Sequence, residues 1–478
     1  MSRTAKCADN TPMNLPKRFS AGLIEKIGQT DFDSYEQELA LPAPVSIRIH
    51  PQKGAELFNE EEIIPWCSYG RYLKKRPAFV WDPLYHAGAY YAQDASSMFF
   101  AKAIDFSNDL KILDLCAAPG GKSSLLLSYM SENSLLVSNE LVGKRAAILY
   151  ENLVKWGGAN NVITNNRVKD FEGYKGYFDV VMIDAPCSGE GMFRKDREAV
   201  EQWSEGLVNQ CSMVQKEILT NAVELIKTGG LLIYSTCTYE SKENEENISW
   251  LYNNYGQKLE PAELAVNPEW GIETVEIDTG SKQKQPGYYC YPHKLKGEGQ
   301  FVAVMRITQN PTYKNNGRGL GKSVRALNKT ELEAISGYSE KKDDYAYLMR
   351  DGDLVFAVPE ALAHDICDFI DRFNIKKAGT LVGKLIRNSL IPDHELVMSG
   401  MASGKMQRVT LNLEQALDYM QRKNIDVPEN IPNGWFILTY SGIDIGLAKN
   451  LGSRINNHYP AEWRIRKEPS AAWEAENY

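Results

Sequence analysis

The chain has 478 residues, 43% of them hydrophobic, which is too long for one core and predicts two to four domains. Eight scattered cysteines without a CxxC pair argue against a zinc site or a disulfide framework, so no metal is expected. The absence of a long apolar run or a signal-peptide pattern predicts a cytoplasmic protein without a membrane partner, and the net charge of −8 argues mildly against nucleic acid.

The predicted pattern of helices and strands changes near residue 106. Before it, the sequence predicts a helix over 21–39 and a strand over 45–49. After it, strands are expected over 111–115, 134–140, 161–166, 178–184, 231–235 and 301–307, with helices over 121–130, 143–155 and 208–227. This alternation predicts an α/β fold with a mostly parallel, doubly wound sheet, whose ligands lie outside the carboxyl ends of the strands.

Four domains are predicted in chain order. They are an N-terminal α+β extension over 1–105, the α/β domain over 106–308, a linker with an intermediate α+β domain over 309–405, and a small α+β module over 406–478. Residues 312–330 carry five Lys and Arg and no acid, so the chain has a locally basic stretch despite its negative net charge.

A glycine-rich turn after the first strand of the α/β domain predicts a nucleotide-like ligand. A phosphate-binding Walker loop would need a glycine at Cys116, and the G-x-G-x-x-G pattern of dinucleotide folds is missing. An adenosyl ligand without a pyrophosphate remains, and S-adenosylmethionine fits best. Glu140, 20 residues after Gly120, is placed to accept from ribose hydroxyls, and Asp170 from the adenine amino group.

Two cysteines follow adjacent predicted strands. Cys187 stands in Asp184-Ala-Pro-Cys-Ser-Gly, and Cys237 in Ser-Thr-Cys-Thr; either one alone is more typical of a buried structural thiol. A thiolate that adds to carbon 6 of cytosine makes carbon 5 nucleophilic toward a methyl sulfonium, which is covalent catalysis. Asp184 would face ring nitrogen 3 and the exocyclic amine. The residues alone leave open which cysteine attacks.

Together these motifs resemble the Nol/Nop/Sun (NSUN) family of RNA 5-methylcytosine methyltransferases. Residues 88–97 and 292–303 are similar to the segments that flank the cofactor fold of that family. The resemblance implies a Rossmann-like class I methyltransferase domain, with Cys237 attacking and Cys187 assisting release. It also implies S-adenosylmethionine contacts from Cys116, Ala117, Ala118, Pro119, Gly120, Gly121, Lys122, Glu140, Asp170 and Asp184.

The C-terminal sequence narrows the resemblance. Residues 446–460 resemble the PUA-like end of the RsmF (YebU) branch, which implies action on small-subunit ribosomal RNA or on the subunit itself. We expect the protein to be a monomer. The basic stretch 312–330 and a second one over 442–467, with five Lys and Arg against two acids, then become candidate phosphate contacts. Four aromatic residues become candidates for stacking on unpaired bases: Trp435, Tyr440, Tyr459 and Trp463.

Several alternatives stay open from sequence alone. The substrate could be tRNA or another RNA, and the enzyme could belong to a class that acts on DNA or on uracil. A non-catalytic assembly factor that binds ribosomal RNA through a dead cofactor fold is the alternative outside enzymes.

Overall fold

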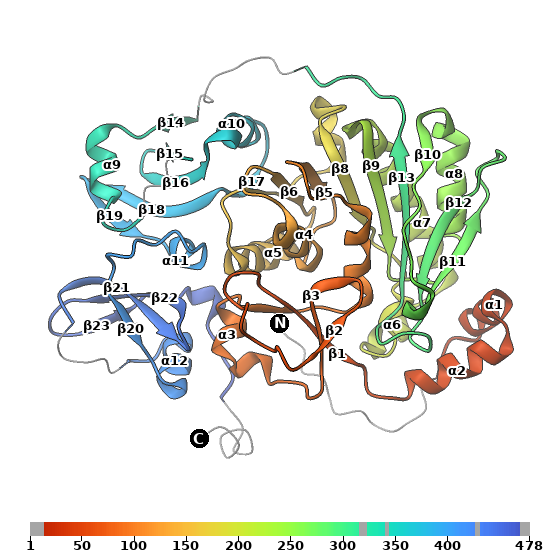
Figure 1. Cartoon of the computed structure of the whole chain (residues 1–478), viewed down its shortest axis with the longest axis horizontal. Coiled ribbons are helices and arrows are strands. Elements are labelled where there is room, and N and C mark those ends of the chain that lie inside the picture. Colours follow the sequence, from red (N-terminus) through yellow and green to blue (C-terminus); the bar gives the residue numbers. More distant parts are fainter. Residues whose placement is uncertain (1–13, 315–322, 340–343, 426–430, 469–478) are drawn as a thin grey trace.

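A computed structural model of the chain describes residues 14–314, 323–339, 344–425 and 431–468 (Figure 1). A ten-stranded sheet forms its centre, in the order β11-β12-β13-β9-β8-β5-β6-β7-β17, with β10 also paired to β13. Five neighbouring strands run parallel: β9 (Ile226–Thr236), β8 (Phe178–Asp184), β5 (Lys111–Asp114), β6 (Leu135–Asn139) and β7 (Asn161–Thr164). Strand order reverses at β5, so the sheet is doubly wound, as predicted, and its ligand crevice lies at the end of β5.

The remaining strands of this sheet are antiparallel. They are β10 (Leu259–Pro261), β11 (Ile272–Ile277), β12 (Gln285–Cys290), β13 (Gln300–Ile307) and β17 (Ile375–Ala378). Strand β17 comes from far along the chain, in the stretch predicted as an intermediate domain, and pairs with β7. The central sheet is therefore completed by a later part of the sequence.

Both faces of the parallel strands are buried, which explains their continuous apolar sequences. Ile112, Leu136 and Met182 face one core with α4 (Gly121–Tyr129) and the 3₁₀ helix η2 (Ser96–Ala103). Their chain neighbours Leu113, Val137 and Val181 face the opposite core with α7 (Glu205–Leu225). Three further helices belong to this domain: α5 (Gly143–Trp156), α6 (Arg197–Gln202) and α8 (Glu245–Tyr255).

Two predicted helices differ from the observed ones. The single helix expected over 21–39 is two helices, α1 (Lys17–Ile27) and α2 (Gln29–Leu39), because Gly28 adopts φ 83° and turns the chain between them. The helix expected over 208–227 ends at Leu225, and β9 begins at Ile226, ahead of the glycines. A Cβ at Gly230 would lie 2.5 Å from the Asp179 carbonyl oxygen, so this glycine permits close strand approach rather than stopping a helix.

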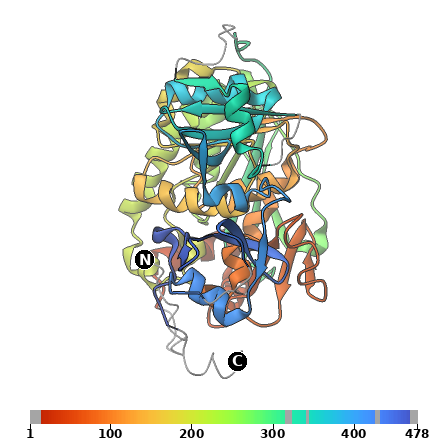
Figure 2. The ribbon, with the colours of Figure 1, turned by 90° about the vertical axis from the view of Figure 1, so that its left-hand side faces the viewer.

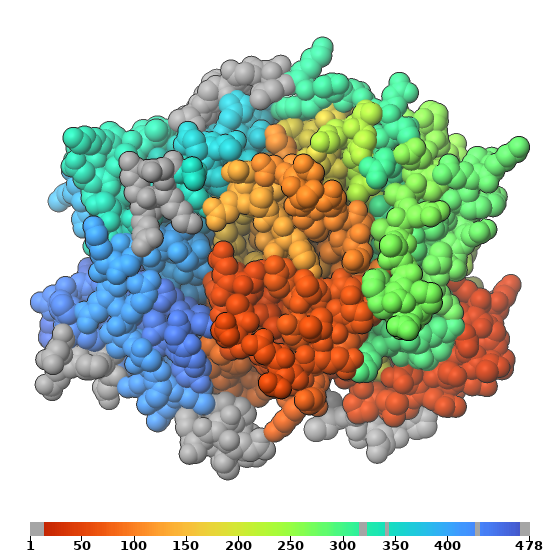
Figure 3. Space-filling view, in the orientation of Figure 1, coloured from red at the N-terminus to blue at the C-terminus, as the bar shows by residue number. Residues whose placement is uncertain are grey.

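The N-terminal extension contains a four-stranded sheet in the order β2 (Glu62–Ile64), β3 (Cys67–Leu73), β1 (Val45–Ile49) and β4 (Tyr90–Ala92), followed in the chain by η2. The helix α3 (Pro83–His86) contacts the C-terminal module. In the space-filling view, this orange-red sheet lies between the blue C-terminal module and the green β11–β12 hairpin (Figure 3). It thus connects the two sides of the molecule.

Two units follow the α/β domain, and they lie one above the other beside it (Figure 2). The upper unit has the sheet β14 (Val324–Ala326), β15 (Tyr345–Arg350), β16 (Leu354–Pro359), β18 (Thr380–Ile386) and β19 (Ser389–Pro392), with helices α9 (Lys329–Ile335), α10 (Ala363–Arg372) and α11 (His394–Met398). The lower unit has β20 (Arg408–Thr410), β21 (Gly434–Tyr440), β22 (Ile443–Asn450) and β23 (Ile455–Asn457), with α12 (Leu413–Met420). The described helices include none that is long and apolar enough to cross a membrane.

The structure tests some of the predicted RNA-contacting residues. Tyr459 is 1% exposed and packs on Tyr419 and His394, so its expected stacking on a base is wrong. Within the basic stretch 312–330, residues 315–322 lie outside the described part of the chain. Arg325 pairs with Glu331 at 2.6 Å, so part of the positive charge is neutralised.

The buried side chain of Arg48 joins the N-terminal sheet to α4. Its Nε donates to Gln93 Oε1 at 2.9 Å, Nη1 to Ser128 Oγ at 2.8 Å, and Nη2 to Ser124 Oγ at 2.5 Å. The guanidinium carbon lies 4.0 Å from the centroid of the Trp156 ring. Burial lowers the pKa of Arg48 to about 10, which leaves it charged at neutral pH.

Replacing Arg48 with Met should destabilise the protein by about 3 kcal/mol, because buried hydroxyl and amide groups lose their partner. Urea unfolding followed by tryptophan fluorescence measures this change. Lys144→Met, at an exposed position of α5, is the control and should stay within about 0.5 kcal/mol of the parent. Equal stability of the two variants would contradict a linking role for Arg48.

Candidate active site

The two cysteines at adjacent strand ends lie in contact. The Sγ atoms of Cys187 and Cys237 are 3.1 Å apart, and both side chains are partly exposed. Cys187 follows β8 and Cys237 follows β9, and the parallel register pairs Asp184 with Ser235 just before them. Parallel pairing therefore brings together two thiols that are 50 residues apart in the sequence.

The surroundings of the two thiols differ. The hydrogen bond with Cys237, together with burial, raises the pKa of Cys187 well above its ordinary value. Cys187 Sγ also accepts from the main-chain N–H of Cys237 at 3.3 Å. Cys187 therefore keeps its proton at neutral pH, and either thiol can be the donor in the contact between the two sulfurs.

Direct hydrogen bonds join the two cysteine loops. The hydroxyls of Ser188 and Thr238, each next to a cysteine, are 2.9 Å apart. The Gly191 N–H donates to the Cys237 carbonyl at 2.8 Å. A Cβ at Gly191 would lie 2.4 Å from the Gly299 carbonyl oxygen, so only glycine fits at this crossing.

Glu190 is buried between these loops. Its Oε2 accepts from the Tyr239 N–H at 2.8 Å, and its Oε1 from Trp203 Nε1 at 2.7 Å. Burial, with a smaller contribution from the neighbouring Glu240, raises the pKa of Glu190 to about 8. Glu190 is thus mostly protonated at neutral pH.

The N-terminal helices support the Cys237 loop from outside. Lys26 Nζ on α1 donates to the Tyr239 carbonyl at 2.8 Å and pairs with Glu245 at 2.7 Å. Tyr35 on α2 packs edge-on against Tyr239, with ring centroids 5.7 Å apart. The extension thus contributes to the site even though its sequence contains none of the chemical motifs.

The glycine-rich turn lies at the end of β5, where the sheet should hold its ligand. Gly120 adopts φ 110° at the N-terminus of α4, and the Ala118–Pro119 peptide bond is cis. Arg145 Nη2 and Asn152 Nδ2 on α5 donate to the carbonyls of Ala118 and Pro119, each at 2.8 Å. Arg145 and Asn152 were missed in the sequence because their contacts depend on how α5 packs.

Acidic groups surround this turn. Asp184 Oδ1 lies 2.5 Å from Lys122 Nζ and accepts from Ser235 Oγ at 2.9 Å. Asp114 is fully buried, and burial raises its pKa to about 7. Burial and the neighbouring carboxylates raise the pKa of Cys116, so this third thiol stays neutral and is no nucleophile.

Glu140 directly follows β6, whereas Asp170 lies six residues beyond β7 in the 3₁₀ helix η3 (Val168–Tyr174), and their environments differ. Glu140 is 3% exposed, and its Oε1 accepts from the Val142 N–H at 2.8 Å. Its Oε2 lies 3.2 Å from Arg145 Nη1 but has no hydrogen bond to any described residue. A buried acceptor without a partner fits a ribose hydroxyl. Asp170 is exposed and accepts from the Arg167 N–H at 3.0 Å.

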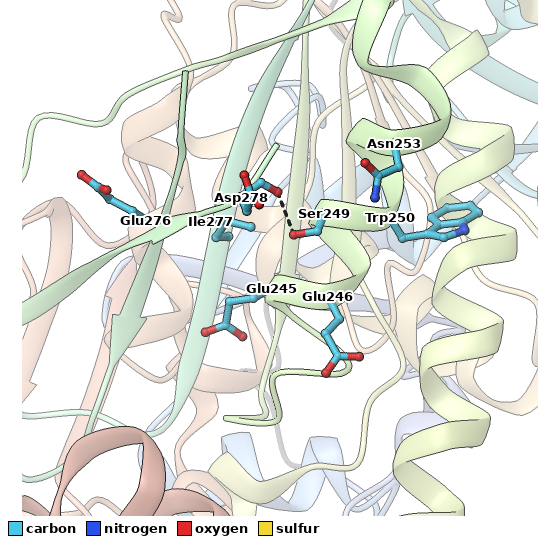
Figure 4. Close-up of a pocket in the computed structure, with 8 residues that line it drawn as sticks. All are labelled: Glu245, Glu246, Ser249, Trp250, Asn253, Glu276, Ile277 and Asp278. Atoms are coloured by element: carbon cyan, nitrogen blue, oxygen red, sulfur yellow. Dashed lines mark hydrogen bonds between the residues drawn. The ribbon is translucent and has the colours of Figure 1, made fainter. Parts of the chain in front are cut away.

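A separate hollow between α8 and β11 has a different chemistry. Its lining is dominated by Glu245, Glu246, Glu276 and Asp278, with Trp250 at one side (Figure 4). The Ser249 hydroxyl donates to the Asp278 carbonyl at 2.8 Å across the hollow. Carboxylates repel phosphates, so this surface does not suit an RNA backbone.

Family models match three parts of the chain. "16S rRNA methyltransferase RsmB/F" matches residues 101–306, the "N-terminal domain of 16S rRNA methyltransferase RsmF" matches 15–95, and the "Methyltransferase RsmF PUA domain" matches 407–465. The predicted Rossmann-like methyltransferase domain and PUA-like C-terminal module are therefore confirmed, as is the use of S-adenosylmethionine as cofactor.

Curated relatives match nearly the whole chain. The ribosomal RNA small subunit methyltransferase F of Shewanella woodyi is 31% identical over 467 residues, covering 90% of this chain and 92% of the relative. The protein of the same name from Pectobacterium atrosepticum is 30% identical and covers 84% of each chain. Among solved structures, a methyltransferase homologue from Pyrococcus horikoshii has a TM-score of 0.52 at 24% identity, covering 62% of this chain and 96% of that one.

Glu190 should make stability depend on pH. Because burial raises its pKa from the unfolded value to about 8, its stabilising contribution is complete below about pH 4 and is lost as the pH rises through 8. The free energy of unfolding should therefore fall between about pH 5 and about pH 9, and Glu190→Gln should flatten this slope. Urea unfolding at a series of pH values measures both. A slope that is identical in the variant would contradict the buried proton.

Proposed function

Because the chain belongs to the RsmF family of ribosomal RNA small subunit methyltransferases, we propose that it transfers a methyl group from S-adenosylmethionine to carbon 5 of a cytosine in ribosomal RNA. The observation that carries this proposal is the contact between Cys187 and Cys237 beside the cofactor turn. Cytosine carbon 5 is a poor nucleophile, and a thiol pair offers both the covalent attack and a separate group for release.

We assign the attack to Cys237. The Cys237 thiol gives its proton to water, its sulfur adds to carbon 6 of the cytosine, and the electron pair of the carbon 5–carbon 6 double bond forms the new bond from carbon 5 to the transferred methyl group. The raised pKa of Cys187 supports this order, because it keeps this sulfur in the less nucleophilic thiol form. After methylation, water takes the proton from carbon 5, its bonding pair restores the double bond, and the bond from carbon 6 to Cys237 breaks with its electron pair left on the sulfur. Cys187 assists this release.

Asp184 is assigned to the base. It is held at the end of β8 by Lys122 and Ser235, three residues before Cys187 in the chain. From there it would hydrogen-bond the edge of the cytosine that carries the exocyclic amine and nitrogen 3. Because Lys122 belongs to the cofactor turn, its contact with Asp184 also keeps Asp184 among the residues proposed to touch the cofactor.

We propose that the glycine-rich turn, Glu140 and Asp170 contact the cofactor. S-adenosylmethionine, when bound, supplies an electrophilic methyl group. The open acceptor of Glu140 would take a ribose hydroxyl, and Asp170 the adenine amino group. The turn would supply the remaining contacts from Cys116, Ala117, Ala118, Pro119, Gly120, Gly121 and Lys122.

The RNA partner is proposed to be small-subunit ribosomal RNA, either free or within the subunit, and the protein is therefore proposed to act in the cytoplasm. The relatives bear the name of a small subunit methyltransferase. The C-terminal PUA domain offers Trp435, whose ring lies 4.4 Å from that of His458 and 5.2 Å from Lys449 Nζ, as a candidate surface for an unpaired base.

Substituting each cysteine separately tests the assigned order. Cys237→Ala should abolish methyl transfer and trap no RNA, because the covalent bond cannot form. Cys187→Ala should accumulate a covalent RNA adduct, because release is slowed. The measurements are transfer of labelled methyl groups to ribosomal RNA or subunits and mobility of the adduct on denaturing gels. The opposite adduct pattern would reverse the assignment, and no transfer by the unmodified protein would favour a binding role.

Glu140→Ala should weaken S-adenosylmethionine binding about tenfold, since one or two hydrogen bonds to the ribose are lost. Isothermal titration calorimetry measures the dissociation constant. Glu172→Ala, which removes another carboxylate at an exposed position, is the matched control and should bind like the parent protein. An unchanged constant for Glu140→Ala would remove Glu140 from the cofactor site.

A further inference from the structure

Four buried polar residues that none of the motifs includes surround the cysteine loops. Gln215 on α7, Glu243 and Asn244 at the start of α8, and Asn247 one turn later are all 0% exposed. A buried polar side chain needs hydrogen-bond partners to offset the free energy of removing it from water. The hydrogen-bond partners of these four side chains show which residues they hold in place.

Glu243 and Gln215 hold the residues on either side of Cys187. The Ser188 N–H donates to the Glu243 carboxylate at 3.2 Å, and Gln215 Nε2 donates to the Pro186 carbonyl at 2.9 Å. Gln215 Nε2 also donates to Glu243 Oε2 at 2.6 Å, so the two side chains form one bracket.

Asn244 holds the residues on either side of Cys237. Its Oδ1 accepts from Thr236 Oγ1 at 2.7 Å, and its Nδ2 donates to the Thr238 carbonyl at 2.9 Å. Asn244 is also the N-cap residue of α8, yet its side chain makes no cap hydrogen bond. Asparagine at this position normally caps the helix through its side chain. Here the side chain instead forms hydrogen bonds with residues at the end of β9 and just after it.

The Gln215–Glu243 pair is the bracket of Cys187, and Asn244 is the bracket of Cys237. Neighbouring groups fix the orientation of both brackets. Asn247 Nδ2 donates to Gln215 Oε1 at 2.7 Å, which leaves the amide nitrogen of Gln215 facing Pro186 and Glu243. Tyr289 OH accepts from Asn244 Nδ2 at 3.0 Å. Glu245 and Glu246, the next residues along the chain, line the acidic hollow on another side of α8 (Figure 4).

We propose that Asn244 is the positioning residue of Cys237, and that Glu243 with Gln215 positions Cys187, so that two consecutive residues at the start of α8 set the geometry of the thiol pair. The roles given to the two thiols rest on the proposed function, but the pairing of each bracket with its cysteine does not. A misplacement of about 1 Å at a reacting group can cost about a hundredfold in rate, which is why such brackets matter.

The test compares Asn244→Ala with Gln215→Ala in the full-length protein. Asn244→Ala should resemble Cys237→Ala, with about a hundredfold slower methyl transfer and little covalent RNA adduct. Gln215→Ala should resemble Cys187→Ala, with slow turnover and an accumulated adduct. Opposite adduct levels from two neighbouring buried sites are not expected from general loss of structure. Asn254→Ala, exposed on the same helix, is the control and should behave like the parent.

Thiol alkylation by iodoacetamide, followed by mass spectrometry, tests the pairing without any RNA. Asn244→Ala should change the alkylation rate of Cys237 more than that of Cys187, and Gln215→Ala should do the reverse. If Gln215→Ala does not bind S-adenosylmethionine, Glu243→Gln takes its place, since it removes one acceptor without changing size. Equal changes at both cysteines in both variants would overturn the proposal. A reversed adduct pattern in the cysteine variants, with each bracket variant still following its own cysteine, would overturn only the assigned order of attack.

Discussion

The parallel pairing of β8 with β9 is the constraint on which the site depends. Its register sets Asp184 opposite Ser235, so that Cys187 and Cys237 emerge side by side from neighbouring strand ends. The β5 end, with the cofactor turn, is next to β8 in the same sheet. A slip of one residue in this pairing would turn alternate side chains to the opposite face and separate the two sulfurs.

Three carboxyl groups near this strand pair and the cofactor turn are buried. Glu190, Glu243 and Asp114 are buried carboxyl groups, and burial raises the pKa values of all three, to about 8, about 7 and about 7. Groups of this kind weaken a fold near neutral pH. Their hydrogen bonds go mainly to main-chain groups of the cysteine loops and to side chains behind the cofactor turn, which suggests that stability is exchanged for a fixed geometry at the site.

The sequence was sufficient for the doubly wound sheet, because each strand is a short apolar run followed by a polar or glycine-rich end. It also predicted that Asp184, Cys187 and Cys237 lie at or just after strand ends, where the structure has them. It was insufficient for Gly28, whose positive φ divides one amphipathic stretch into two helices, and for Tyr459, whose aromatic ring is buried. Strand β17 joins β7 across about 200 residues, and no local pattern predicts such a pairing.

The supporting residues were missed for a related reason. Glu243 and Asn244 follow the Thr-Cys motif by only six and seven residues, so their proximity in sequence was visible. A Glu-Asn pair at the start of a polar helix, however, is typical of ordinary helix capping. The role of this Glu-Asn pair depends on α7, which brings Gln215 next to Glu243 and Asn247, and on β12, which contributes Tyr289. The motifs thus specify the reacting groups locally, whereas their relative placement is specified by packing among elements that are distant in sequence.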